Sequence, residues 1–216
     1  QTQIYPLGER ALVLDPSPLE PLSWELQAKL CWLATELRLD NRLVEVIPGM
    51  NNLTLVIKNP RQLKSVKDSL HELWQRAPDT TFEPQTVTLP VKYGGEFGPD
   101  LIKVAQYHDI SPEEVVHLHS QAIYRVFFIG FQPGFAYLEG LPLTLHTPRL
   151  ATPRLKIPAG SVGIGGEQTG VYPLASPGGW QIIGQTQTPL FDPLSDVPCR
   201  LTPGDTVRFQ AKEICL

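Results

Sequence analysis

Proline and glycine crowd the second half of this sequence, and their distribution restricts the fold more than any other feature. The chain of 216 residues holds 22 prolines and 17 glycines. Proline lacks a backbone donor and glycine loses the most entropy on ordering, so long helices are disfavoured there. Short apolar runs lie between turn residues, in KIPAGSVGI (156–164), GVYPLASPGGWQIIGQT (170–186), PLF (189–191) and TVRFQ (206–210). This pattern of many short strands predicts a closed β-barrel.

The first half shows both strand and helix spacing. Short strands are expected at ALVL (11–14), LVEVI (43–47) and LTLVI (53–57), and the last two flank the turn residues PGMNN. Leucines at positions 22, 26, 30, 33 and 37 predict a helix over 19–38. A second helix is expected after Asn59–Pro60, a cap followed by a first-turn proline. Its apolar face would comprise Leu63, Val66, Leu70, Leu73 and Trp74.

These elements predict two domains. Strands backed by two helices form a two-layer α+β unit that resembles a ferredoxin-like fold, and we assign it to residues 1–80. APDTTFEPQ (77–85) has two prolines and no periodicity, so we interpret it as a linker. The mainly β domain is then expected over 86–216, opening with the strand TVTLPVKY (86–93).

Two short helices are expected early in the second domain. One would run from Pro99 to about Tyr107. The other begins at SPEE (111–114), where a serine cap, a first-turn proline and a glutamate form a capping box, and it ends near Ser120. The apolar run IYRVFFI (123–129) that follows predicts a strand.

Composition excludes several classes of protein. The formal charge of −4 and the pI of about 5.7 argue against a nucleic-acid binder, which needs a basic face. The sequence contains no run of about 18 apolar residues, so no membrane span is predicted. Cys31, Cys199 and Cys215 are widely spaced, which disfavours a zinc site or disulfide framework and fits a reducing cytoplasm.

The segment GFQPGF (130–135) interrupts a good strand and is the first candidate for a functional surface. Gly130 and Gly134 permit tight turning. Phe131 and Phe135 could then line an apolar surface, with the Gln132 amide as a polar group. The alternative interpretation is that both phenylalanines belong to the core.

A second candidate region contains two TPRL repeats, whose arginines are Arg149 and Arg154. An arginine at a rigid turn can make a two-pronged contact with a carboxylate or phosphate, although both could equally be solvated loop residues. GIGGEQTG (163–170) lacks the Lys-Ser or Lys-Thr of a phosphate-binding loop, so a hairpin turn is the preferred interpretation. Polar and stacking groups nearby are Gln168, Thr169 and Trp180.

Histidine and acidic residues give no metal-binding pattern. His117 and His119 lie two apart on a predicted helix and would point to different faces. The scattered Asp and Glu residues lack the spacing of a magnesium site, so no metal ligands are assigned. His119 could transfer a proton in a cleft, or it could be structural.

Long motifs connect this sequence with a known family. They are GFQPGFAYLEGLP (130–142), the stretch from TPRL to IIGQT (147–186), PLFDP (189–193), GERALVL (8–14), IPGMNNLTL (47–55) and LTPGDTVRF (201–209). Over nearly its whole length the sequence resembles the family of the 5-oxoprolinase B subunit, also called allophanate hydrolase subunit 1, which includes a sporulation-kinase inhibitor. Ala136 and Glu139 stand where Pro and Gly are common in that family.

The resemblance implies a cyclophilin-like barrel and one of three subunits that open 5-oxoproline to glutamate at the expense of ATP. The B and C subunits would activate the lactam by phosphorylation, and the A subunit would complete hydrolysis. ATP is expected to bind together with the partner subunit, which allows Mg²⁺ beside it. The alternatives are a histidine-kinase inhibitor, a carboxyltransferase-type subunit that acts on a urea-like amide and, by fold analogy alone, a prolyl isomerase.

We therefore predict that one open cleft or subunit face gathers the candidate residues. Catalytic roles are assigned to Arg154 and to His119, and His119 is expected at the edge of the cleft. An arginine clamp and a proton donor suit a transferring phosphoryl group. Substrate or partner binding is assigned to Phe131, Gln132, Phe135, Gln168, Thr169 and Trp180.

Overall fold

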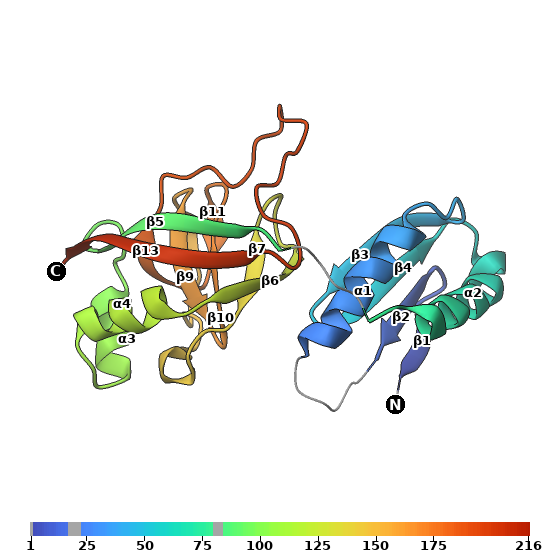
Figure 1. Cartoon of the computed structure of the whole chain (residues 1–216), viewed down its shortest axis with the longest axis horizontal. Helices are drawn as coiled ribbons and strands as arrows, with labels where there is room; N and C mark the ends of the chain where they lie inside the picture. Colours follow the sequence, from blue (N-terminus) through green and yellow to red (C-terminus); the bar gives the residue numbers. More distant parts are fainter. Residues whose placement is uncertain (1, 17–22, 80–83) are drawn as a thin grey trace. The chain divides into compact units, whose positions relative to one another are not determined.

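The computed structural model describes residues 2–16, 23–79 and 84–216, and it divides into two compact units, Gln1–Phe82 and Glu83–Leu216 (Figure 1). Each unit has its own apolar core. The division falls inside the segment 77–85, and separate folding of the two domains stays a prediction. None of the described helices is both long enough and apolar enough to span a membrane.

The N-terminal unit is a four-stranded antiparallel sheet with two helices. The strands follow the order β1-β2-β4-β3, and their bounds are β1 Gln3–Leu7, β2 Ala11–Asp15, β3 Leu43–Gly49 and β4 Asn52–Ile57. The helices are α1 Trp24–Leu37 and α2 Leu63–Arg76, the latter preceded by a 3₁₀ turn, η1 Pro60–Gln62. Asn59 Oδ1 accepts a hydrogen bond from Arg61 N at 3.0 Å, as expected of a cap. Leucines from α1, β2 and β4 are fully buried in one core.

Two expectations for this unit need comment. Strand β1 was not predicted, because it is a mostly exposed edge strand that tolerates Pro6 and lacks a buried face. The two-layer arrangement is present, but its connection order β-β-α-β-β-α differs from the β-α-β-β-α-β order of ferredoxin-like folds, so that label is not confirmed. Residues 19–22 of the predicted helix over 19–38, including Leu22, lie outside the described residues.

The C-terminal unit contains the predicted closed barrel, with seven strands in the order β10-β7-β6-β13-β5-β12-β9. Strands β5 and β13 run side by side in parallel (Figure 1). The strands are β5 Thr86–Gly94, β6 Tyr124–Ile129, β7 Ala136–Glu139, β9 Ser161–Gly165, β10 Gln168–Val171, β12 Gln181–Gln185 and β13 Thr206–Cys215. The cyclophilin-like label for this barrel stays a prediction.

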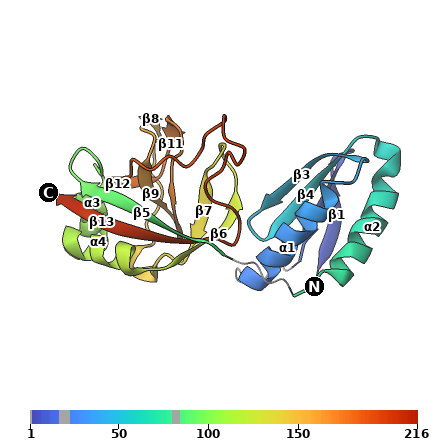
Figure 2. The same ribbon diagram turned by 45° about the horizontal axis from the view of Figure 1, so that its top comes forward.

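Short elements outside the barrel position the candidate residues. Strands β8 Arg154–Ile157 and β11 Ser176–Gly178 form a separate two-stranded sheet (Figure 2). Residues 189–191, predicted as a strand, make only an isolated bridge from Phe191 to Cys199. A 3₁₀ turn, η2, spans Leu143–Leu145.

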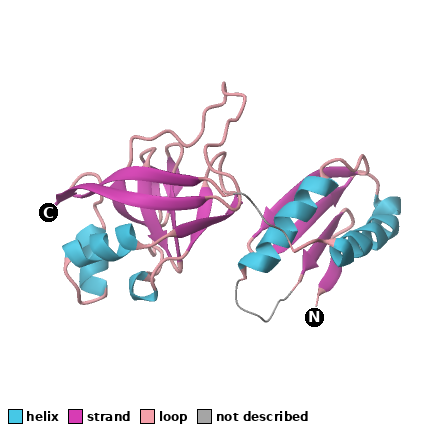
Figure 3. Cartoon of the chain, in the orientation of Figure 1, coloured by secondary structure: helices cyan, strands magenta, loops and turns pink. Residues whose placement is uncertain are grey.

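Helices α3 Leu101–Tyr107 and α4 Pro112–Gln121 pack together beside the barrel (Figure 3). Ser111 Oγ caps α4 by accepting from Glu114 N at 3.1 Å, which confirms the predicted start. Helix α4 contacts β13, and α3 contacts β12.

Candidate functional site

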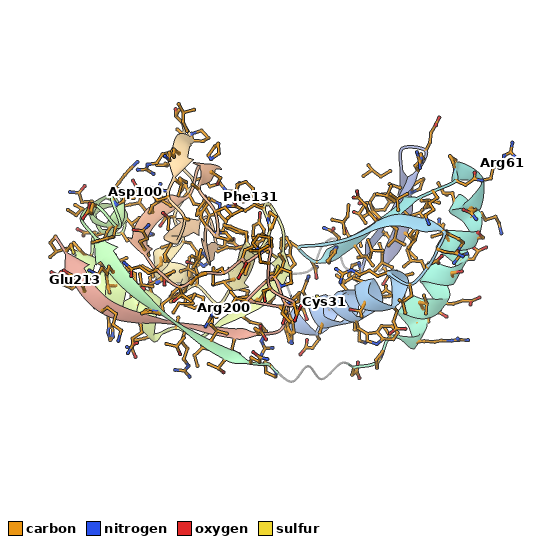
Figure 4. The ribbon with its side chains drawn as sticks, turned by 90° about the horizontal axis from the view of Figure 1, so that it is seen from above. Cys31, Arg61, Asp100, Phe131, Arg200 and Glu213 are labelled. Carbon is orange, nitrogen blue, oxygen red and sulfur yellow. The ribbon has the colours of Figure 1, made fainter. Side chains whose placement is uncertain are left out.

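The turn at 130–135 holds Phe131 in an unusual conformation. Its φ is +66°, in the left-handed region, and Gly134 follows with φ +80°. Phe135 N donates to Gln132 O at 3.0 Å, and Gly130 N donates to Phe135 O at 3.1 Å. Phe131 is 61% exposed. Figure 4 labels its position in the C-terminal unit. Since a bulky residue in this conformation is a genuine outlier, the exposed ring is a candidate for function.

Behind this turn lies a group of rings that we call the aromatic cluster: Phe131, Phe135, Tyr137, Tyr172 and Trp180. Ring centroids of contacting pairs lie 5.0–6.4 Å apart, mostly edge to face, the geometry that aromatic quadrupoles favour. Burial raises the pKa of both tyrosine hydroxyls, so they stay protonated near neutral pH.

Glycines beside the aromatic cluster make room for its rings. A Cβ at Gly165 would overlap the Trp180 indole, and one at Gly178 would lie 2.5 Å from the Tyr172 hydroxyl. Gly166, with φ +66°, turns the chain between β9 and β10, whose pairing is antiparallel. The segment 163–170 is therefore the predicted hairpin turn, and its glycines serve aromatic packing.

Arg154 forms an ion pair inside the chain. Its Nη1 and Nη2 each donate to one carboxylate oxygen of Asp100 at 2.7 Å. Asp100 Oδ2 also accepts from Ile182 N at 2.7 Å, and the carboxylate is 5% exposed. These bonds tie the start of α3 to β8 and β12. The fork that was expected to hold a ligand anion is thus occupied by a carboxylate of the protein.

His119 lies fully buried in the barrel interior, which contradicts its predicted place at a cleft edge. Thr169 Oγ1 donates to Gly163 O at 2.8 Å, so it accepts from His119 Nε2–H at 2.9 Å. His119 Nδ1 then accepts from the Tyr93 hydroxyl at 2.8 Å. Burial lowers the pKa of His119 to about 3, and burial raises that of Tyr93. The neutral imidazole is a structural link between α4, β5 and β10.

The prediction of one open cleft is wrong in its geometry. The structure brings Phe131, Phe135 and Trp180 together, and Gln132 Nε2 reaches Ser176 Oγ at 3.4 Å beside them. It places Thr169 with His119 inside the barrel, Arg154 at Asp100 and Gln168 at the β9–β10 turn. A barrel interior filled by side chains cannot expose residues that point inward. The predicted roles of these residues stay predictions.

Sequence reasoning missed a concave surface, which we call the α3 pocket. It has a volume of about 220 Å³ and is lined by Lys103, Val104 and Tyr107 of α3, residues 147–151 and Gln181 of β12. Arg149 lies at this pocket and also over the Trp180 ring, with Cζ 5.9 Å from the centroid. The first TPRL repeat and the polar Gln181 next to the apolar Ile182 and Ile183 were the available signals.

Comparison with known proteins defines the family. Residues 2–201 match the family described as carboxyltransferase domain, subdomain C and D. The chain belongs to this family.

Curated relatives and solved structures agree with that assignment. The chain is 49% identical to the 5-oxoprolinase B subunit of Escherichia coli O157:H7 over 100% of this chain and 99% of the relative. Identity to the protein of the same name from Haemophilus influenzae is 48%, covering 95% and 96%. The crystal structure of TTHA0988 has a TM-score of 0.81 at 36% identity, covering 94% of this chain. The present chain spans 40% of that solved chain.

Proposed function

We propose that this chain is the B-type subunit of a 5-oxoprolinase complex that converts 5-oxo-L-proline to L-glutamate. The observation that carries this proposal is the identity of 45–49% to three relatives, each named as the B subunit of 5-oxoprolinase, including one from Bacillus subtilis. The complex is proposed to depend on ATP. The C subunit would act with this chain in lactam phosphorylation, and the A subunit would complete hydrolysis.

The chemistry explains why several subunits are needed. A five-membered amide is resonance-stabilised, and its opening requires a better electrophile at the carbonyl carbon, addition of water and protonation of the leaving nitrogen. The contribution that suits the residues of this chain is binding and orientation of the substrate, because positioning supplies a large part of the rate enhancement in such reactions.

The described residues do not fit a complete ATP or Mg²⁺ site. Residues 163–170 form a hairpin around aromatic rings, and no group of three or more His, Cys, Asp or Glu side chains among the described residues could hold a metal. We therefore assign nucleotide binding to the assembled complex and derive no step of this chain from the nucleotide.

Phe131 is proposed to face a partner subunit. The ring is largely exposed, its backbone is strained, and the buried part of the aromatic cluster supports it from below. Aromatic side chains on a rigid base are common at the centres of protein interfaces. Gln132, beside it, would add a polar contact at the rim.

The alternatives carry less support. Kinase inhibition has no described feature in its favour. The Kluyveromyces lactis urea amidolyase structure has a TM-score of 0.77 at 20% identity, and this likeness concerns the fold alone.

The test is reconstitution with purified subunits. Co-purification of this chain with the C subunit, followed by addition of the A subunit, ATP and 5-oxo-L-proline, is expected to release glutamate. Omitting this chain or ATP should abolish release. Turnover by this chain alone would contradict the partner requirement, and no glutamate from the full assembly would contradict the function.

A further inference from the structure

Two cationic residues line the α3 pocket. Lys103 belongs to α3, and Arg149 belongs to the first TPRL repeat. Both residues are exposed, and neither forms a salt bridge with a described residue. No acidic side chain is among the described residues that line the pocket. Two cations that line one small concavity favour an anionic ligand.

The wall that carries Arg149 is fixed to the end of α3. Thr147 Oγ1 donates to Leu145 O at 2.8 Å and accordingly accepts from His108 Nε2–H at 2.9 Å. Thr147 also pairs with Gly166 through a β-bridge. Together with the Arg154–Asp100 pair at the start of α3, these contacts hold both walls in a set position. A preformed site of this kind loses little entropy when a ligand binds.

Gln181 adds a specific polar requirement. The residue is 5% exposed and is among those that line the pocket, and Nε2 donates to Pro148 O at 2.9 Å. Its Oε1 is buried and has no hydrogen-bond partner among the described residues. Buried polar atoms are rarely left unpaired, so a small movement of the side chain that opens this oxygen to the pocket would let it accept from a ligand N–H or O–H.

We propose that the α3 pocket binds a small carboxylate with a neighbouring N–H donor, the chemistry that 5-oxo-L-proline offers. The carboxylate would contact Lys103 and Arg149, and the lactam N–H would donate to Gln181 Oε1. The naming of this substrate rests on the proposed function. The pocket volume of about 220 Å³ is small, which suits a ligand with a single small ring.

Ligand discrimination tests the two halves of this assignment on the full chain. Calorimetric titration with 5-oxo-L-proline is expected to saturate, and NMR shifts should centre on α3 and residues 147–151. The lactone in which ring oxygen replaces N–H should bind about tenfold more weakly, as should pyrrolidin-2-one, which lacks the carboxylate. Inorganic phosphate that binds as tightly as 5-oxo-L-proline, or no saturable binding, would overturn the proposal.

Substitutions provide matched controls. Arg149→Gln should weaken binding about tenfold or more, whereas Arg208→Gln, at an exposed arginine on β13, should leave it unchanged. Gln181→Met should abolish the preference for 5-oxo-L-proline over the lactone, a ratio that partial loss of stability does not alter. Equal affinities of wild type and Arg149→Gln, or an unaltered ratio in Gln181→Met, would overturn the site.

The binding tests and the glutamate-release assay can fail independently of one another. A reconstituted complex that releases glutamate while these binding results fail overturns the pocket alone. A complex that releases no glutamate overturns the proposed function, even where the pocket binds its ligand.

Discussion

The two TPRL repeats have the same four residues but different surroundings. In the second repeat, Arg154 begins β8 and is paired by both nitrogens with the buried Asp100 carboxylate. In the first repeat, Arg149 is exposed at the α3 pocket, over the Trp180 ring. Arg149 is therefore available to a ligand, whereas the guanidinium of Arg154 is already held by a carboxylate of the protein.

Buried polar groups in the barrel have hydrogen-bond partners within the protein, whereas one polar atom at the α3 pocket has none in the described part of the chain. His119, Tyr93 and Thr169 satisfy one another inside the barrel, as Arg154 and Asp100 do beside it. Gln181 Oε1 at the pocket has no such partner among the described residues. We assign the satisfied groups to the stability of the barrel and the unsatisfied group, with the two cations, to binding.

The largest expected effect concerns His119. Because burial lowers its folded pKa to about 3 from an ordinary value of 6.5, its contribution is fully present above pH 6.5 and is lost as the pH falls toward 3. The free energy of unfolding should therefore fall by about 1.4 kcal/mol per pH unit below pH 6.5, or on the order of 5 kcal/mol over the whole range down to pH 3.

Urea denaturation at a series of pH values would measure this slope in the wild type and in His119→Gln. Burial also lowers the pKa of His108, so His108→Gln is the control and should retain most of the slope. A His119→Gln variant with an unchanged slope would show that His119 is not the buried neutral group described.

The second expected effect concerns the paired arginine. Arg154→Gln leaves the Asp100 carboxylate with fewer partners and should lower the free energy of unfolding by about 1.5–3 kcal/mol. A double-mutant cycle with Asp100→Asn should give a coupling energy of at least ~1 kcal/mol. If the effects of the two substitutions were additive, the Arg154–Asp100 pair would contribute nothing to stability, and Arg154 would not differ from Arg149 in this respect.

The smallest expected change in stability follows substitution of Phe131. Phe131→Gly relieves a left-handed backbone that costs ~1–2 kcal/mol, while glycine adds ~0.5–1 kcal/mol of unfolded-state entropy. The melting temperature should therefore hardly move, while co-purification with the C subunit should weaken. Leu155→Ala, at a leucine 91% exposed on β8, is the control expected to assemble normally. Normal assembly of Phe131→Gly would remove Phe131 from the partner surface.

Much of the fold followed from neighbours in the sequence. The caps at Asn59 and Ser111, the 163–170 hairpin and the alternation of short strands with Pro and Gly are local features, so the barrel was predictable. The edge strand β1 was not, because it has no buried face that would impose a pattern.

The candidate site was less predictable because it depends on distant partners. Asp100 lies 54 positions before Arg154, and Tyr93 lies 26 before His119. No spacing rule distinguishes Arg149 from Arg154 in identical tetrapeptides. The sequence allowed two interpretations of Phe131 and Phe135, an exposed apolar surface or the core. Each phenylalanine fits a different one: Phe135 is 1% exposed and belongs to the core, whereas Phe131 is not buried.

The kinetic effect of Arg149→Gln in the reconstituted complex is the most direct test of this arginine's role. We expect kcat/KM for 5-oxo-L-proline to fall at least about tenfold, while the melting temperature of the variant chain and its assembly stay at wild-type values. Wild-type kcat/KM from a fully assembled Arg149→Gln complex would show that Arg149 does not serve the ligand.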